Sequence, residues 1–373
     1  MEPFVRIVCA VAGVALVGVV LDSAVRTFVV PRGMAQPVTR TVMGGVRRIF
    51  MFRLDHARTY EARDRRMALY GPVSLLVLPL VWLLMVGGAF TLLFRAAGVE
   101  SWRIAFEASG SSLLTLGFER PSESIPVLAL AFAEAALGLA LVALLISYLP
   151  TIYGAYSRRE VLVTQSATRA GTPPTITTFI RRAHLIGWIE ELDDHWIAWQ
   201  TWFAELEETH TSFAILPFFR STAPDRSWIT AAGSMLDAAS VIEAAVDAPQ
   251  QPHARLCIRS GMLALRSIAT FYRVPFDEDP VPGDPISVTR DEFEVVLDEL
   301  AAAGVPLIED RDRAWLDFAG WRVNYDTVLI AIAALVMAPY AEWISDRSPA
   351  YSAPGAHHRF HKPGQVPDTE APR

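Results

Sequence analysis

Residues Thr115, Leu116, Gly117, Phe118 and Glu119 form a short segment between two long apolar stretches. The segment is poor in the residue patterns that favour helices or tight turns. The stretches run from about Pro72 to Phe94 and from about Pro126 to Leu149, and each is long enough to cross a bilayer. Non-helical backbone at membrane depth is tolerated only where protein buries it or where it lines a watery path. The sequence therefore predicts a loop that dips into a membrane between two spans.

A third apolar block lies at the N-terminus, from Phe4 to Leu21, with Arg6 as its one charge. Its length meets the lower limit for a spanning helix, which needs roughly 20 residues. A cleaved signal peptide is the alternative, but no small-x-small cleavage site follows the block. The helical pattern instead continues through Asp22 and Arg26, which can pair at i,i+4. We expect a retained transmembrane helix.

Composition favours a membrane anchor joined to a soluble part. Hydrophobic residues make up 52% of the chain, and its 20% of charged residues are concentrated outside the three apolar blocks. Cys9 and Cys257 lie far apart in sequence, so no disulfide framework or cysteine metal site is expected. The sequence has no Gly-rich nucleotide loop, no Gly-x-Ser-x-Gly elbow and no His-Glu-x-x-His pair. We therefore expect no enzyme activity and no cofactor.

Arginine placement predicts the orientation of the chain. Residues 31–66 carry nine arginines against three acids; the arginines are Arg32, Arg40, Arg47, Arg48, Arg53, Arg58, Arg63, Arg65 and Arg66. An excess of basic residues in a short loop marks the cytoplasmic side of a membrane. Arg158 and Arg159 follow the third block and favour the same side. Three spans then place the N-terminus outside and the C-terminal part in the cytoplasm. The basic loop is interpreted as a topology signal that contacts lipid, not as a nucleic-acid site.

The central part of the chain resembles the pore domain of potassium channels over residues 67–155. That family has an outer helix, a short pore helix, a Thr-Val-Gly-Tyr-Gly filter followed by an acid, and an inner helix with a central glycine. Here Pro72 to Phe94 is similar to the outer helix, and Ser101 to Leu114 is similar to the pore helix. Thr115 to Glu119 resembles the filter, and Pro126 to Leu149, with Gly138, resembles the inner helix.

The resemblance implies a filter of backbone carbonyls contributed by four chains. Such carbonyls replace the hydration shell of a cation. Thr115 would add a hydroxyl at the inner end, and Gly117, which has no Cβ, can adopt positive φ. Leu116 and Phe118 would pack behind the filter. The resemblance implies a homotetramer, because one loop supplies a quarter of the ring, with a monovalent cation such as K⁺ as the permeant ion.

One position departs from the family pattern, because the second filter glycine is missing. Glu119 stands in its place or, if one residue is deleted, in the place of the acid that follows it. A glutamate at positive φ is costly, so the deletion is physically easier. In both cases four carboxylates would surround the outer mouth and attract cations, without choosing potassium over sodium. Cation selectivity is therefore expected, and potassium selectivity is left open.

Several residues near the loop are candidates for gating. Glu134 lies inside the third apolar stretch, where a charge is costly and usually faces the protein interior. It is either a gating or permeation group bonded to Ser111 or Ser112, or a protonated or hydrogen-bonded packing residue. Gly138 matches the hinge position of the family's inner helix, and close packing is the alternative role for a glycine in a membrane helix.

The cytoplasmic part is predicted to be all-helical. A linker from Gln165 to Thr175 leads into one helix expected over Thr178 to about Glu208. On that helix His184, Glu191 and His195 would share one side and could form a divalent-metal or proton-sensing site. A solvated edge is the alternative, because no tight pair such as His-x-x-x-His is present.

Four further helices are expected in this part, at Ser227 to Val246, His253 to Tyr272, Arg290 to Ala303 and Asp310 to Val323. Leu329 to Tyr340 is interpreted as a buried core helix, and a fourth span over 327–343 is the alternative.

The fold class predicted is an all-α membrane protein with three transmembrane helices, a re-entrant pore loop and an all-α cytoplasmic domain. Its parts are an N-terminal transmembrane helix (1–30), an Arg-rich cytoplasmic linker (31–66), a pore domain (67–155), a cytoplasmic helical domain (156–345) and a disordered tail (346–373). The expected function is that of a multi-pass cation channel of the cell membrane, regulated by its cytoplasmic domain. Its expected partners are membrane lipid and further copies of itself, not nucleic acid. The alternative is a membrane-anchored sensor or scaffold that keeps a pore-like fold without conducting.

Overall fold

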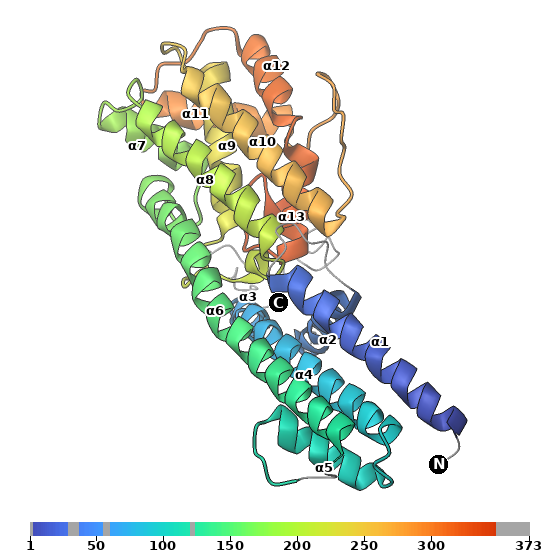
Figure 1. Ribbon diagram of the computed structural model, residues 1–373. Coiled ribbons are helices and arrows are strands. Elements are labelled where there is room, and N and C mark those ends of the chain that lie inside the picture. The colour runs from blue at the N-terminus through green and yellow to red at the C-terminus, as the bar shows by residue number, and fades with distance from the viewer. Residues whose placement is uncertain (1–2, 29–36, 55–59, 120–123, 348–373) are drawn as a thin grey trace, which may run out of the picture. The chain divides into compact units, whose positions relative to one another are not determined.

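The structure is a computed structural model that describes residues 3–28, 37–54, 60–119 and 124–347 (Figure 1). The tail expected to be disordered lies almost entirely outside the described residues. Within them the chain is all-helical apart from one isolated β-bridge between Val246 and Leu307, so the predicted all-α class is confirmed. The helices are α1 (Pro3–Phe28), α2 (Pro37–Leu54), α3 (Tyr60–Met67), α4 (Tyr70–Ala96), α5 (Trp102–Leu113), α6 (Ile125–Ala170), α7 (Ile176–Leu185), α8 (Asp193–Ser212), α9 (Trp228–Ala245), α10 (Pro252–Tyr272), α11 (Arg290–Ala302), α12 (Arg311–Arg322) and α13 (Asp326–Val336), with 3₁₀ turns η1 (Leu216–Phe218) and η2 (Ser345–Arg347).

The chain divides into two compact units. The first contains Met1–Phe52, Leu69–Gly154 and Ser212–Ile215, and the second contains Arg53–Ala68, Ala155–Thr211 and Leu216–Arg373. Helix α6 therefore begins in the first unit and ends in the second. Residues 53–68, which precede α4 in sequence, belong to the second unit together with the part of α6 that follows Gly154.

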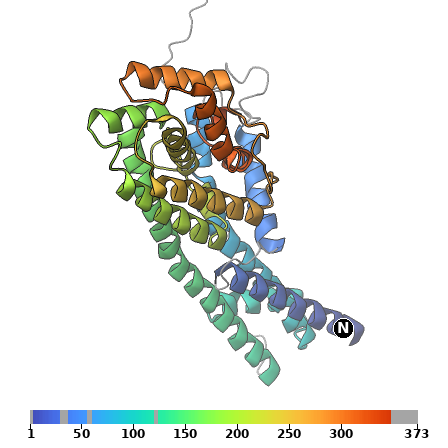
Figure 2. The same cartoon turned by 90° about the horizontal axis from the view of Figure 1, so that it is seen from above.

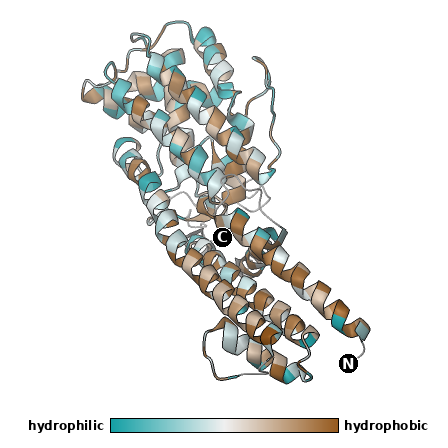
Figure 3. Cartoon of the chain, viewed as in Figure 1, coloured by the Kyte–Doolittle hydropathy of each residue, from teal (hydrophilic) through white to brown (hydrophobic). Residues whose placement is uncertain are grey.

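Among the described residues, three helices are long and apolar enough to cross a membrane: α1, the stretch Asp64–Ala96 that contains α4, and α6. They coincide with the three apolar blocks, and Figure 3 shows hydrophobic colour along α1, α4 and the first half of α6. These helices indicate a multi-pass membrane protein. The pair α12 and α13 passes the same test only when taken together, and it bends by 55° at its break.

Helices α1 and α4 pack closely in the first unit. A Cβ added at Gly13 would lie 2.7 Å from Leu93 Cγ and 2.9 Å from the carbonyl oxygen of Ala89, so only glycine permits this approach. The indole Nε1 of Trp82 donates a 3.1 Å hydrogen bond to Ser23 Oγ, and both side chains are buried. A polar pair across two apolar helices also fixes their register.

The Arg-rich region between the first two spans contains α2 and α3, which the sequence interpretation did not anticipate. In α2, Thr39 and Val46 are buried, whereas Ile49 and Phe52 are exposed at 58% and 73%. The helix therefore combines a buried side, exposed apolar residues and several arginines.

Helix α6 continues to Ala170, so the linker predicted to begin at Gln165 is wrong. The residues buried along this part lie three or four apart: Ala155, Arg159, Val163, Ser166 and Ala170. That spacing places them on one side of a helix. The Ser and Thr residues of this region suggested a loop, but tertiary packing decides its conformation. The non-helical connection is reduced to residues 171–175.

Helix α9 forms the centre of the second unit. All but one of its residues are buried, and Figure 2 shows it nearly end on, with other helices of the unit around it. Helices α7, α10, α12 and α13 all pack against it. Because it is buried on nearly every side, α9 is the central core helix of this unit.

A buried ionic network joins α9, α12 and α13. The Arg322 guanidinium is fully buried and bonds Asp237, Asp326 and the carbonyl oxygen of Trp343. The Tyr325 hydroxyl lies 2.9 Å from both Asp237 Oδ1 and Ser240 Oγ. Burial alone would lower the pKa of Arg322, but Asp237 and Asp326 raise it above its ordinary value. The arginine is therefore charged and held between two carboxylates at the bend between α12 and α13.

The single helix expected from Thr178 to Glu208 is wrong, because the chain breaks between α7 and α8. Gly187 has a φ of +68°, and its N–H donates to the His184 carbonyl, while the Trp188 N–H donates to the Ala183 carbonyl. These two bonds form a Schellman motif, which ends a helix at a glycine. The apolar stripe that suggested one helix belongs to α7, the connection and α8 in turn.

The remaining helices follow the sequence interpretation. Helices α9 to α12 match the four predicted ranges to within two residues at each end. The predicted core helix is α13, in which Leu329 and Ile332 are fully buried and which packs against α9 and α10.

Candidate functional site

Helix α5 and the segment after it form the candidate site. The helix begins at Trp102, where Ser101 is the N-cap and its Oγ accepts a 3.4 Å hydrogen bond from the Ile104 N–H. It ends at Leu113, close to the predicted boundary at Leu114. The following residues, Leu114 to Glu119, belong to neither a helix nor a strand. The sequence interpretation of a short helix followed by irregular backbone is therefore confirmed.

One residue, Ser111, holds this irregular segment. Its backbone carbonyl accepts hydrogen bonds from the N–H groups of Leu116, at 2.8 Å, and Gly117, at 3.4 Å. Its hydroxyl oxygen accepts a third from the Glu119 N–H, at 3.2 Å. Ser111 is itself buried. The N–H groups of Leu116, Gly117 and Glu119 are thus satisfied by one residue of α5.

The carbonyl groups of the segment are left without such partners. Among the described residues, no hydrogen bond is accepted by the carbonyl oxygens of Thr115, Leu116, Gly117 or Phe118. Thr115 has a φ of +56° and Gly117 a φ of +70°, so left-handed conformations recur two residues apart. For threonine this conformation costs about 1–2 kcal/mol. Unpaired carbonyls on a strained backbone are the chemistry that a cation can use as ligands.

The side chains of the segment are exposed within one chain. Leu114, Leu116 and Phe118 are exposed at 58%, 61% and 65%. The expected packing of Leu116 and Phe118 behind a filter is therefore absent within the described part of a single chain. Any such packing requires other molecules.

Glu119 is half-buried and is the last described residue before the gap at 120–123. It is not among the described residues that have positive φ. A second filter glycine would need that conformation, so the backbone at Glu119 resembles an acid that follows a filter more than a glycine within one.

Behind the segment, the carboxyl group of Glu134 lies in a fully buried polar cluster. Ser109 Oγ is 2.5 Å from Glu134 Oε1 and 2.9 Å from the carbonyl oxygen of Gly87, so the cluster joins α6, α5 and α4. The expected bond to Ser111 or Ser112 is wrong, because Ser109, two and three residues earlier on α5, is the partner. The other oxygen, Oε2, has no partner among the described residues.

The number of protons available in this cluster bears on whether the Glu134 carboxyl group is protonated. A hydroxyl carries one proton, so Ser109 donates to only one of its two acceptors at a time. When it donates to the Gly87 carbonyl, the short contact with Glu134 needs a proton on the carboxyl group. A protonated or hydrogen-bonded packing residue was one of the two roles considered for Glu134, and this geometry favours it.

Gly138 lies at a close approach of α6 to the end of α5. A Cβ at this position would lie 2.6 Å from the carbonyl oxygen of Leu113 and 2.9 Å from Leu113 Cδ1. Of the two roles considered for Gly138, the geometry therefore supports close packing directly. The contact lies at the last residue of α5, directly before the segment that Ser111 holds.

The candidate metal site is not formed in the described part of the chain. No group of three or more His, Cys, Asp or Glu side chains that could hold a metal ion occurs there. His184 lies in α7, His195 in α8 and Glu191 in the connection between them, so the three do not share one helix as expected.

His195 is instead buried in an aromatic cluster of the second unit. Its ring stacks on Phe179 at 5.0 Å and contacts Trp196 at 4.9 Å. Its Nδ1 lies 2.9 Å from Arg169 Nη1, and because arginine only donates, this nitrogen must be unprotonated. Burial, and then the charge of Arg169, lower the pKa of His195 to about 3.

A second histidine of α8, His210, has a similar arrangement. Its Nε2 lies 3.4 Å from Arg159 Nη1, and its ring packs on Trp228 at 4.8 Å. Burial and then Arg159 lower the pKa of His210 well below its ordinary value. Sequence spacing had suggested His195 as a ligand or proton sensor, and His210 was not among the predicted site residues. In the structure both act as neutral hydrogen-bond acceptors for arginines of α6.

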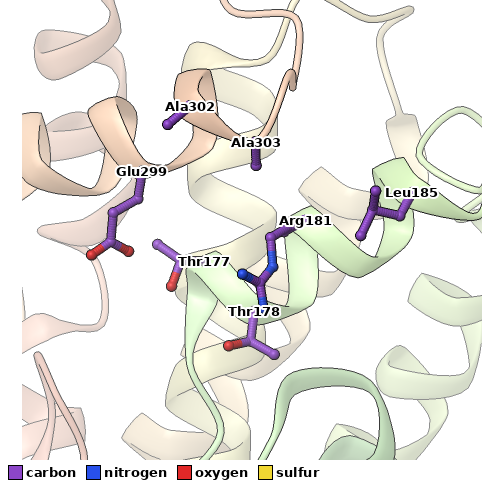
Figure 4. A pocket seen from close by; sticks show the side chains of 7 residues that line it. All are labelled: Thr177, Thr178, Arg181, Leu185, Glu299, Ala302 and Ala303. Carbon is purple, nitrogen blue, oxygen red and sulfur yellow. The ribbon is translucent and has the colours of Figure 1, made fainter.

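The second unit also has an open groove between α7 and α11. Its volume is about 610 Å³, and Figure 4 shows the side chains that line it: Thr177, Thr178, Arg181, Leu185, Glu299, Ala302 and Ala303. All of these are exposed or half-exposed. The groove brings one cation and one carboxylate together with hydroxyl groups, and no sequence motif had indicated it.

Comparisons of the chain with protein family models, with curated proteins and with solved structures find no match. A function for this chain is therefore inferred from the geometry of the site and from the sequence resemblance.

Proposed function

We propose that this protein is one subunit of a homotetrameric cation channel that resembles potassium channels. In this proposal α4 is the outer helix, α5 the pore helix and α6 the inner helix. The segment from Thr115 to Glu119 is one quarter of the filter.

The observation that carries the proposal is the arrangement of the backbone around Ser111. The N–H groups of Leu116, Gly117 and Glu119 are bonded to that one residue, while the carbonyls from Thr115 to Phe118 accept no hydrogen bond from described residues. An unpaired backbone group at membrane depth costs on the order of several kcal/mol unless something else satisfies it. A permeant cation and its water provide that partner.

The exposed side chains of the segment support assembly. Leu116 and Phe118 are large apolar residues that stay 61% and 65% exposed in the described part of one chain. Along α6, exposed apolar residues recur at spacings of three, four or seven positions, which keeps them near one side of the helix: Ile125, Leu128, Phe132, Leu139, Val142, Ile146 and Leu149. Further copies of the chain, together with lipid, would cover these surfaces.

The membership of the second unit supports the proposed orientation. Residues Arg53–Ala68 and the residues that follow Gly154 belong to the same unit, and in our proposal they share one side of the membrane. With α1 as one further crossing, the N-terminus is on the opposite side. The arginines at 31–66 assign the shared side to the cytoplasm.

Glu119 shapes the selectivity that we propose. Four carboxyl groups near the outer mouth attract cations of either kind, and selection of potassium would depend on the carbonyl ring alone. We therefore propose conduction of monovalent cations, with regulation by the helical second unit.

The test is a cation flux assay on the full-length protein in liposomes. We expect flux that is abolished in Gly117→Ala, because alanine is strained at a φ of +70°. Gly110→Ala is the matched control: it is a helical glycine with nothing within 4 Å of an added Cβ, and it should conduct like the wild type. Flux no greater than that of Gly117→Ala would refute conduction.

Native mass measurement gives the second arm of this test. We expect four subunits, and a monomer or dimer would exclude a four-fold filter built from one loop per chain. A tetramer without flux would leave the alternative function, a membrane-anchored sensor or scaffold. Recording under bi-ionic conditions with Glu119→Gly then tests the filter alignment, since restored potassium selectivity supports substitution and lost conduction supports deletion.

A further inference from the structure

Residues Leu216 to Arg220, here called the junction segment, follow α8 and begin with the short turn η1. Leu216, Phe218 and Phe219 are buried at 0%, 8% and 5% exposure. Several backbone carbonyls of this segment receive hydrogen bonds from side chains of other elements in the second unit. A segment without regular structure of its own is thus fixed by donors that arrive from elsewhere.

The continuation of α6 supplies three of those donors. Arg159 Nη1 donates to the carbonyl of Leu216 at 3.1 Å, and Nη2 donates to that of Phe219 at 2.7 Å. The Tyr156 hydroxyl donates to the carbonyl of Arg220 at 3.0 Å. The Arg159 side chain is only 2% exposed, and its planar group of five N–H donors suits the gathering of several carbonyls.

Helix α3 reaches the same segment through an ion pair. Arg220 Nη1 lies 3.1 Å from Asp64 Oδ1, and the two side chains are exposed at only 11% and 9%. Removal of one partner from a buried pair leaves an uncompensated charge, which makes the surviving partner disruptive. Asp64 lies in α3, and only two residues separate the end of α3 from the start of α4.

A third element, α13, is held by the same arginine. Arg220 Nη2 donates a 2.9 Å hydrogen bond to the carbonyl of Val336, the last residue of α13. A guanidinium at a helix C-terminus also interacts favourably with the partial negative charge there. Arg220 therefore contacts α3 and the core helix α13 with its side chain, and α6 through its own carbonyl.

These contacts have a consequence for the proposed channel. Helix α3 leads directly into the proposed outer helix, and the residues at 155–170 continue the proposed inner helix. We propose that Arg220 is the positioning residue that couples the lead-in of the outer helix and the extension of the inner helix to the core of the second unit. A change within that core would then reach both pore helices through one short segment. This inference rests on the proposed function for its effect on conduction, but not for the coupling itself.

The coupling is tested by amide hydrogen exchange on the full-length protein. In Arg220→Gln we expect exchange to rise at least about fivefold, within the range of measured couplings, both around Asp64 in α3 and at 155–163 in α6. Asp64→Asn should loosen the same part of α6, although the two are far apart in sequence. Arg220→Lys keeps the charge, but an ammonium group cannot bond both Asp64 and the Val336 carbonyl as the guanidinium does. This variant controls for failure to fold, and it should give a smaller rise in exchange in the same segments.

Arg255→Gln is the matched control, because Arg255 forms an ion pair of 2.5 Å with Glu243 elsewhere in the same unit. It should leave exchange in α3 and at 155–163 unchanged. If Asp64→Asn loosens α3 but not α6, or if Arg255→Gln acts like Arg220→Gln, the coupling is refuted.

Flux through the same variants tests the effect on conduction. We expect Arg220→Gln and Asp64→Asn each to change the flux per tetramer at least about threefold. The double variant should change it no further, because both substitutions break the same connection. Arg255→Gln should conduct like the wild type. If exchange changes in these variants but flux does not, the link between the coupling and the pore is refuted. If the wild type shows no flux, the proposed function is refuted, and the exchange result alone tests the coupling.

Discussion

The contact at Gly138 allows a quantitative test of how α5 and α6 pack. In Gly138→Ala the new Cβ would lie 2.6 Å from the Leu113 carbonyl oxygen, a backbone atom that cannot rotate away. Such overpacking typically costs about 1–3 kcal/mol. Alanine also gains roughly 0.5–1 kcal/mol over glycine within a helix, which partly hides that cost.

Gly88→Ala provides the matched control, because Gly88 lies within α4 and has nothing within 4 Å of an added Cβ. Both variants gain the same helical preference, so the difference between them isolates the overpacking term of about 1–3 kcal/mol. We expect Gly88→Ala to be as stable as the wild type or more stable, and Gly138→Ala to be less stable than Gly88→Ala by that amount.

The assay is a denaturant titration of the full-length protein in detergent, which gives the free energy of reversible unfolding. Cation flux is the second readout. A displaced end of α5 should also lower the flux of Gly138→Ala, because the segment held by Ser111 begins there. Equal free energies of unfolding for the two variants would refute the close approach of α6 to the Leu113 carbonyl.

Three further predictions concern buried polar groups. Glu134→Gln should keep the free energy of unfolding within about 0.5 kcal/mol of the wild type and Glu134→Ala should lose about 1–3 kcal/mol, because a neutral hydrogen-bonding group is what the cluster needs; equal losses in the two variants would contradict a protonated carboxyl group. His195 has a folded-state pKa of about 3, below its unfolded value near 6.5, so the unfolded state binds more protons between these two pH values. The contribution of neutral His195 to the free energy of unfolding is therefore complete above pH 6.5 and falls by about 1.4 kcal/mol per pH unit as the pH drops towards 3. His195→Gln should remove this pH dependence from the free energy of unfolding measured across the same range. Arg322→Met should cost about 3–5 kcal/mol because it leaves Asp237 buried without its cation, whereas Arg290→Met, which breaks an exposed pair, should cost less than about 1 kcal/mol; similar losses in thermal unfolding would contradict the buried network.

Much of the helical framework could be predicted from the sequence because local signals and packing agree there. The three apolar blocks, α5 with its cap at Ser101, and α9 to α12 each have a hydrophobic period and end signals that point the same way. In the segment after α5, Gly117 was expected at positive φ because it lacks a Cβ, and it has that conformation. Thr115 at positive φ could not be predicted, because the bonds of Ser111 impose it on a residue that disfavours it.

The errors arose where local signals competed. Gly187 and Trp188 end α7, but the apolar period continues through the break and hid the glycine signal. Glu134 was expected to bond Ser111 or Ser112, and the bond to Ser109 depends on how α5 is rotated against α6. A sequence states which serines are available, whereas the rotation of a helix is set by its packing.

The three hydrogen bonds at Ser111 differ in whether a substitution of this residue removes them. Two use its backbone carbonyl, which every amino acid possesses, so no substitution at this position removes those acceptors. The third uses its hydroxyl and disappears with any side chain that lacks an acceptor of similar reach. The positions of Leu116 and Gly117 are thus protected against mutation at this residue, while the end at Glu119 can be loosened by a single change of codon. A substitution at position 111 would therefore alter the Glu119 end of the segment first and leave Leu116 and Gly117 in place.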